Sequence, residues 1–139
     1  MASMEVTKYA LRDLYRHEVM MLESYTAQLA EMPPGKAKDL IQRIHGDEIK
    51  HCEVFKKLLQ QFDPGLKPSG PVKPRSWNFD KELREAIEWD QQMEEKLEGV
   101  YIEQLGNADL TDEVKEAIEE VMRETHAHSE LLKVLLLDM

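Results

Sequence analysis

The feature that most constrains the fold of this chain is the segment 63–79, which separates two long stretches of helical periodicity. Its helix-breaking residues are Pro64, Gly65, Pro68, Gly70, Pro71 and Pro74. This composition excludes a helix, and the segment lacks the alternation of apolar and polar residues that is typical of a strand. Seventeen residues without secondary structure are unusual inside a compact domain, so we expect the segment to have a structural task.

The residues before this segment predict one helical hairpin. Apolar side chains recur at spacings of three and four over residues 4–31 and again over residues 36–62. Between them, Met32-Pro33-Pro34-Gly35 ends the first pattern, because proline and glycine stop a helix. The positions expected to face inward include Leu11, Leu14, Met21, Tyr25, Ile41, Ile44, Phe55 and Leu58.

The residues after the segment predict a second hairpin, with helices over residues 80–105 and 112–138. A turn from Gly106 to Asp112 joins them, and Thr111 is the expected N-cap of the last helix. No strand is predicted anywhere. We therefore expect an all-α, four-helix bundle that forms a single domain over residues 1–139.

The length of the 63–79 segment indicates how the two hairpins are joined. If the second and third helices run in the same direction, the link must travel the length of the bundle. A helix of about 26 residues is about 39 Å long, and seventeen extended residues reach roughly 55 Å. The sequence thus predicts two antiparallel hairpins connected by one long crossover, a known topology of four-helix bundles.

Composition excludes several classes of partner. The net charge of −10 argues against nucleic acid and is compatible with attracting cations. No apolar run approaches the ~20 residues of a membrane span, and residues 1–5 lack the basic and apolar regions of a signal peptide. The one cysteine, Cys52, cannot form an internal disulfide or a four-cysteine metal module within this chain, and fits a cytoplasmic location.

Glu48 and His51 place a carboxylate and an imidazole on one face of the second helix, since residues i and i+3 share a face. Both lie within the apolar stripe of that helix. Glu18 lies in the stripe of the first helix, and Glu18 and Glu48 are each about 15 residues from the turn between them. In antiparallel helices the two glutamates therefore lie at the same height along the bundle. Burial of their carboxylates in an apolar stripe costs free energy unless they are paired or bound to a metal ion.

The second half of the chain repeats this layout with Glu94 and His128. The shared spacings are seven residues from Glu to Tyr, in Glu18–Tyr25 and Glu94–Tyr101, and 33 or 34 residues from Glu to His, in Glu18–His51 and Glu94–His128. Two halves that aim a Glu and a His at one centre indicate a metal site inside a helical bundle. An oxygen-rich site with one imidazole per ion suits iron or manganese better than structural zinc.

In these residues the chain resembles the ferritin-like di-iron carboxylate superfamily, which includes rubrerythrins, bacterioferritins and ferritins. In its symmetric members, the first and third helices each supply a Glu, and the second and fourth each supply Glu-x-x-His. The resemblance extends from the first helix to the fourth, and its strongest local match is Asp47-Glu48-Ile49-Lys50-His51.

This resemblance implies a role for each candidate ligand. Glu18 and His51 would hold one metal ion, Glu94 and His128 would hold the other, and Glu48 would bridge the two. It also places Tyr25 and Tyr101 near the metals, where they are either core aromatics with a polar tip or redox-active residues.

Thr125 departs from the pattern. It stands three residues before His128, where a symmetric site has its second bridging Glu. Glu124, four residues before His128, is the candidate substitute ligand, and the alternative is a solvated residue at the edge of the stripe. Asp90 and Glu98, one turn on either side of Glu94, are further candidates for ligands or for partners of ligands.

The resemblance implies two iron ions, with manganese and zinc as alternatives, and oxidation of Fe(II) by dioxygen or hydrogen peroxide, as in a ferroxidase or a rubrerythrin. Rubrerythrins usually carry a four-cysteine electron-transfer module that this chain lacks, so electrons would come from an external donor or from free Fe(II). A homodimer is also expected. The alternative, favoured by Thr125, is a non-catalytic metal carrier or a degenerate bundle that acts as an interaction module.

Overall fold

A computed structural model of the chain describes residues 3–65 and 73–139, and this part contains four α-helices and no strand. The helices are α1 (Met4–Glu31), α2 (Lys36–Phe62), α3 (Phe79–Leu105) and α4 (Asp112–Leu137). Their bounds agree with the predicted ranges to within one residue, which confirms the all-α, four-helix bundle. None of these helices is long and apolar enough to cross a membrane.

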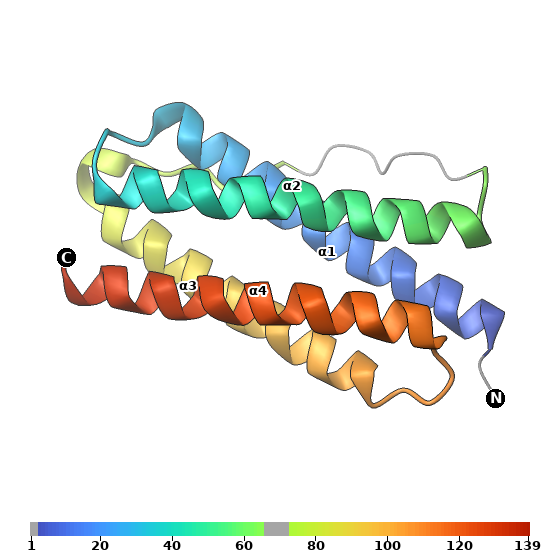
Figure 1. The fold of residues 1–139 in the computed structure, drawn as a ribbon. Helices are drawn as coiled ribbons and strands as arrows, with labels where there is room; N and C mark the ends of the chain where they lie inside the picture. Colours follow the sequence, from blue (N-terminus) through green and yellow to red (C-terminus); the bar gives the residue numbers. More distant parts are fainter. Residues whose placement is uncertain (1–2, 66–72) are drawn as a thin grey trace.

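The helices pack as two antiparallel hairpins, α1 with α2 and α3 with α4, and α2 also packs against α4 (Figure 1). The helices α1 and α3 touch each other less than any of these three pairs. Figure 1 shows that α2 and α3 run in the same direction, so the chain returns along the bundle between them, as a crossover requires. Residues 66–72 of the predicted crossover lie outside the described residues.

Local sequence explains where the helices begin. In three of them the side chain of a polar residue accepts a hydrogen bond from a backbone N–H of the first turn; these capping residues are Ser3, Asn78 and Thr111. The cap predicted at Thr111 is therefore confirmed. α2 instead begins after Gly35, whose φ of 148° lies in a region that favours glycine because it has no Cβ.

Apolar stripes from all four helices meet in one core, which contains among others Leu11, Leu14, Tyr25, Ile41, Ile44, Phe55, Ile87, Tyr101, Ile118 and Leu132. Polar side chains interrupt this core near the middle of the helices. The buried members are Glu18, Glu48, His51, Glu94, Thr125 and His128. Because fully buried carboxylates are costly without partners, this belt is the part of the fold that requires a functional explanation.

Candidate metal centre

Five of the predicted ligands come together in two overlapping groups. One group is Glu18, Glu48 and His51, and the other is Glu48, Glu94 and His128; within each group the candidate ligand atoms lie within 4.8 Å of one another. All five side chains are at most 3% exposed. Glu48 belongs to both groups and therefore lies where a bridging ligand is needed.

The Glu48 carboxylate lies between the two imidazoles. Its Oε2 is 3.6 Å from Nδ1 of His51, and its Oε1 is 3.5 Å from Nδ1 of His128. Oε2 of Glu18 is 3.6 Å from the first of these nitrogens, and Oε2 of Glu94 is 3.8 Å from the second. These separations are longer than good N–H···O hydrogen bonds, whereas a metal ion placed among the atoms would bring each of them a partner.

The atoms that face this centre have no hydrogen-bond partner. They are Oε2 of Glu18, both carboxylate oxygens of Glu48, Nδ1 of His51, Oε2 of Glu94 and Nδ1 of His128. A buried polar atom left without a partner costs about 1–3 kcal/mol, so a set of them around one point calls for a ligand. Carboxylate and imidazole donors are suited to divalent transition metals. The residues present therefore fit a metal centre.

The outer nitrogen of each imidazole contacts a carboxylate from the other hairpin. Nε2 of His51 lies 2.5 Å from Oε2 of Glu124, and Nε2 of His128 lies 2.8 Å from Oδ2 of Asp47. Because an ionised carboxylate only accepts hydrogen bonds, the proton belongs on Nε2, and Nδ1 is directed to the centre. The two rings lie nearly parallel, with centroids 5.9 Å apart.

The two tyrosines hold the terminal carboxylates in the same reciprocal way. The Tyr25 hydroxyl of α1 donates to Oε1 of Glu94 in α3 at 2.7 Å, and the Tyr101 hydroxyl of α3 donates to Oε1 of Glu18 in α1. Burial, with the nearby carboxylates, raises the pKa of both tyrosines well above 10, so each hydroxyl keeps its proton. Each glutamate thus has one oxygen fixed and one oxygen directed to the centre.

Without metal, the histidines act as the cations of the site. Burial alone lowers the pKa of an imidazole, but contacts with Glu18 and Glu48 outweigh it and raise the pKa of His51 to about 11. Contacts with Glu48 and Glu94 likewise raise the pKa of His128 to about 10. Burial and the neighbouring Glu48 charge raise the pKa of Glu18 to about 8. Binding of a metal ion must therefore displace protons from both imidazoles.

A family model corresponds to most of this chain. The rubrerythrin family model matches residues 10–136, which include most of α1, nearly all of α4, the whole of α2 and α3, and every residue of the centre. The chain belongs to the rubrerythrin family. Comparisons with curated proteins and with solved structures gave no match. Membership of this family confirms the resemblance to the ferritin-like di-iron carboxylate superfamily that the Glu and His spacing predicted.

The rubrerythrin-family centre of this chain is asymmetric at Thr125. This side chain is fully buried, and its Oγ1 has no hydrogen-bond partner. It takes the place on α4 that Glu48 takes on α2, three residues before the histidine. Glu124 does not replace the missing carboxylate in this structure, because it contacts the outer nitrogen of His51 and belongs to neither group. As a metal ligand it stays a prediction.

The other candidates near this rubrerythrin-family centre also lie outside both groups. Asp90 is buried and accepts a hydrogen bond from Nε2 of Gln28 at 2.6 Å. Burial raises the pKa of Asp90, and the contact with Gln28 opposes that rise in part. Glu98 lies near the surface, where its carboxylate is 2.8 Å from Nδ1 of the exposed His126.

Asp47 is the functional residue that the sequence reasoning did not assign. It was part of the matched Asp47–His51 segment, but no role was predicted for it. A usable pattern was present: Asp47 precedes His51 by four residues, and Glu124 precedes His128 by four. That pattern would have suggested that the two acids have equivalent roles, yet each contacts the histidine of the opposite hairpin, which local spacing does not reveal.

Proposed function

We propose that this rubrerythrin-family protein binds two iron ions in its buried centre and oxidises Fe(II) with dioxygen or hydrogen peroxide. The observation that carries the proposal is the convergence of unpartnered carboxylate oxygens and imidazole nitrogens from all four helices. Iron is the metal because the donor set is rich in oxygen and because rubrerythrins usually bind it.

In this proposal, Glu18 and His51 bind one ion, Glu94 and His128 bind the other, and Glu48 bridges them. The position of Glu48 between the two imidazoles supports the bridging role. When bound, the two Fe(II) ions would each supply one electron and become Fe(III), and with two protons these electrons would reduce one molecule of hydrogen peroxide to two molecules of water. Manganese and zinc fit the same donors, but zinc has no redox chemistry to contribute.

The surrounding side chains prepare the centre for this reaction. Three carboxylates favour the more highly charged ferric ions over ferrous ions. Tyr25 and Tyr101 fix the carboxylates of Glu94 and Glu18, so that the oxygens facing the centre are held in place. Asp47 and Glu124 fix the imidazoles. The apolar core around the five buried ligand side chains excludes bulk water, which strengthens the charge interactions among them. The tyrosines serve in positioning, and a redox role for them is a further proposal.

The reaction needs partners that this chain does not supply. With one cysteine, these 139 residues cannot form a four-cysteine electron-transfer module, and the proposal therefore includes an external donor or fresh Fe(II) that returns the centre to its reduced state. A homodimer is part of the proposal. Exposed Val134 and Leu137 near the end of α4 supply apolar surface for such a contact.

The alternative function is a non-catalytic metal carrier, and Thr125 is the observation that favours it. Replacing a second bridging carboxylate with a neutral hydroxyl removes one negative charge from the centre. The group of Glu48, Glu94 and His128 would then hold its ion more weakly. A chain that retains a single ion tightly would be a carrier, and one that retains none would be an interaction module.

The deciding experiment loads metal-free protein with Fe(II) in the absence of air and then admits oxygen or hydrogen peroxide. We expect about two ions per chain, absorbance characteristic of oxo-bridged ferric iron, and consumption of the oxidant faster than in buffer containing the same Fe(II). One ion with no oxidation would support the carrier, and absence of bound metal would sink both proposals.

Two variants connect this activity to the site. The double variant Glu48→Ala, His51→Ala should lose bound metal and oxidation together, as measured by elemental analysis and oxidant consumption. Glu53→Gln changes an exposed acid on the same helix and serves as the matched control. Equal metal content in all three proteins would place the iron elsewhere.

A further inference from the structure

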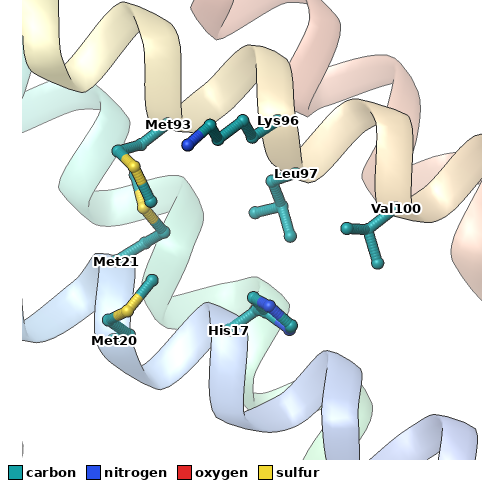
Figure 2. A pocket seen from close by; sticks show the side chains of 7 residues that line it. All are labelled: His17, Met20, Met21, Met93, Lys96, Leu97 and Val100. Atoms are coloured by element: carbon teal, nitrogen blue, oxygen red, sulfur yellow. The ribbon is translucent and has the colours of Figure 1, made fainter.

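A pocket of about 330 Å³ opens between α1 and α3, which touch each other far less than the two helices of either hairpin do. Its walls are mostly apolar, and its lining includes Met20, Met21, Met93, Leu97 and Val100 (Figure 2). Pockets that hold small ligands begin at about 300 Å³ and are typically apolar with a few polar groups. This pocket therefore has the size and chemistry for a small, largely apolar molecule.

The pocket lies beside the metal centre without being part of it. Met21 and Leu97 are buried and contribute to its wall. Each stands three residues beyond a candidate ligand of the centre, Glu18 in α1 and Glu94 in α3. The pocket wall is therefore formed one helical turn along α1 and α3 from the two glutamates. None of the residues that line the pocket belongs to either ligand group.

Lys96 gives the pocket a positive charge. Its side chain extends along the α3 side of the pocket (Figure 2). Within residues 3–65 and 73–139, Lys96 forms no ion pair. Its neighbours one helical turn away are all uncharged: Gln92, Met93, Gly99 and Val100. An ammonium group without an acidic partner is notable in a chain with 28 acidic residues, and it is available to an anionic ligand.

His17 adds a second polar group on the opposite wall, where its ring projects from α1 into the pocket (Figure 2). Its Nδ1 lies 2.8 Å from the backbone carbonyl oxygen of Asp13. A carbonyl oxygen only accepts, so Nδ1 is the donor, and Nε2 is left to interact with a ligand.

We propose that this pocket binds a small amphiphilic carboxylate, with its hydrocarbon part against the methionines, Leu97 and Val100 and its carboxylate at Lys96. Methionine side chains are flexible and polarisable, so they adapt to hydrocarbon groups of different shape. The charge of Lys96 selects a carboxylate over an alcohol or an amine of the same size. The site is independent of the proposed iron chemistry and places an organic acid next to the centre.

The test is a titration of octanoate into protein labelled with ¹³C at the methionine methyl groups, followed by NMR. Shifts are expected at Met20, Met21 and Met93, and octanoate should bind at least about tenfold more tightly than octanol, octylammonium or acetate. The titration is run on both metal-free and metal-loaded protein. Binding to metal-free protein supports the pocket even if iron oxidation fails.

Variants separate the charge from the cavity. Lys96→Gln should lower the affinity for octanoate about tenfold and leave the affinity for octanol unchanged, as expected for the loss of one charge-assisted contact. The matched control is Lys56→Gln, which replaces an exposed lysine on α2 and should change neither the octanoate affinity nor the octanol affinity. Val100→Trp fills the pocket and should abolish octanoate binding, with its fold checked by circular dichroism. Unshifted pocket methionines, or equal octanoate affinity with and without Lys96, would overturn the proposal.

Discussion

The two hairpins of this protein supply matching parts around the candidate metal centre, yet they differ at its middle. Each gives a glutamate, a tyrosine, a histidine and an acid four residues before that histidine. In α2 the residue three before the histidine is Glu48, and in α4 it is Thr125. The comparison shows that the surroundings of the centre follow a two-fold pattern, whereas the position three residues before each histidine does not.

The matching parts act across the hairpins rather than within them. Tyr25 contacts Glu94, while Tyr101 contacts Glu18. The acids and histidines are exchanged in the same way between α2 and α4. Neither hairpin can therefore form half of the site alone, because the glutamate and the histidine of each hairpin are held by side chains of the other hairpin.

The largest effect should come from Glu48→Gln, which removes the one carboxylate shared by both groups. We expect the affinity for both ions to fall by more than about 100-fold, beyond the cost of losing an outer partner. Isothermal titration with Fe(II) under nitrogen measures it. Thr125→Val, at the equivalent position of α4, should change either affinity less than tenfold. If Thr125→Val were as damaging as Glu48→Gln, the two positions would not differ as the structure indicates.

Thr125→Glu should remove the asymmetry, with opposite effects in the two states of the protein. In metal-free protein, a further buried carboxylate should lower the free energy of unfolding by about 1–3 kcal/mol, as urea denaturation would show. In metal-loaded protein, the added charge should bind the second ion roughly tenfold more tightly. Thr125→Gln supplies similar bulk without charge, so a gain in affinity there would contradict the electrostatic explanation.

Asp47→Asn and Glu124→Gln test the exchange of positioning groups. Each should lower the affinity of the protein for one of the two ions by about 10–100-fold. Glu124→Gln should lower the affinity for the ion bound by His51, because Glu124 contacts His51. It should do so although Glu124 lies on the same helix as His128. ¹⁵N NMR of the two imidazoles, with zinc as the ion, identifies which site is weakened. The exposed Glu120→Gln is the control, and selective weakening at His128 by Glu124→Gln would instead make Glu124 a ligand of the second ion.

The pH dependence of metal-free protein should be common to both hairpins. The pKa of His51 rises from 6.5 to about 11 on folding and that of His128 from 6.5 to about 10, because the neighbouring carboxylates outweigh burial. The folded state thus holds more protons. The contribution of the two histidines to stability is fully present below pH 6.5 and is lost as the pH rises through their folded pKa values. The contribution of Glu18, whose pKa rises from 4.5 to about 8, is fully present below pH 4.5 and is also lost as the pH rises.

Melting curves in the presence of chelator check this expectation. The Tm of metal-free protein should fall by on the order of 5 °C or more between about pH 6 and pH 10. Metal-loaded protein should not show the fall, since the ion replaces the imidazole protons. A Tm of metal-free protein that rises over this range would contradict the assigned protonation states.

The smallest effect concerns positions where the hairpins should behave alike. Gly46 in α2 and Gly99 in α3 both lie inside helices, and an added Cβ would meet no atom within 4 Å. Gly46→Ala and Gly99→Ala should each stabilise the fold by about 0.5–1 kcal/mol through helix propensity, without changing metal content. Urea denaturation measures both, and a loss of metal in either variant would show that helix stability and the centre are coupled.

Much of the fold could be predicted because its determinants are local. The segments Pro33-Pro34-Gly35 and Pro64-Gly65 predict the ends of α1 at Glu31 and of α2 at Phe62, and Thr111 predicts the start of α4. The depth of Glu18, Glu48 and Glu94 followed from their places in apolar stripes. The destination of Glu124 could not be predicted in this way, because its partner His51 lies 73 residues away on another helix.

By itself the sequence determined four helices, their antiparallel pairing, and which acids and imidazoles face inward, because periodicity, breakers and spacing depend on neighbouring residues. The tertiary structure decided which oxygen or nitrogen each of these groups directs to the centre, and that the supporting acids and tyrosines are exchanged between hairpins. It also decided that α1 and α3 separate enough to leave a pocket. These outcomes depend on the packing and rotation of whole helices against one another, and no local pattern encodes them.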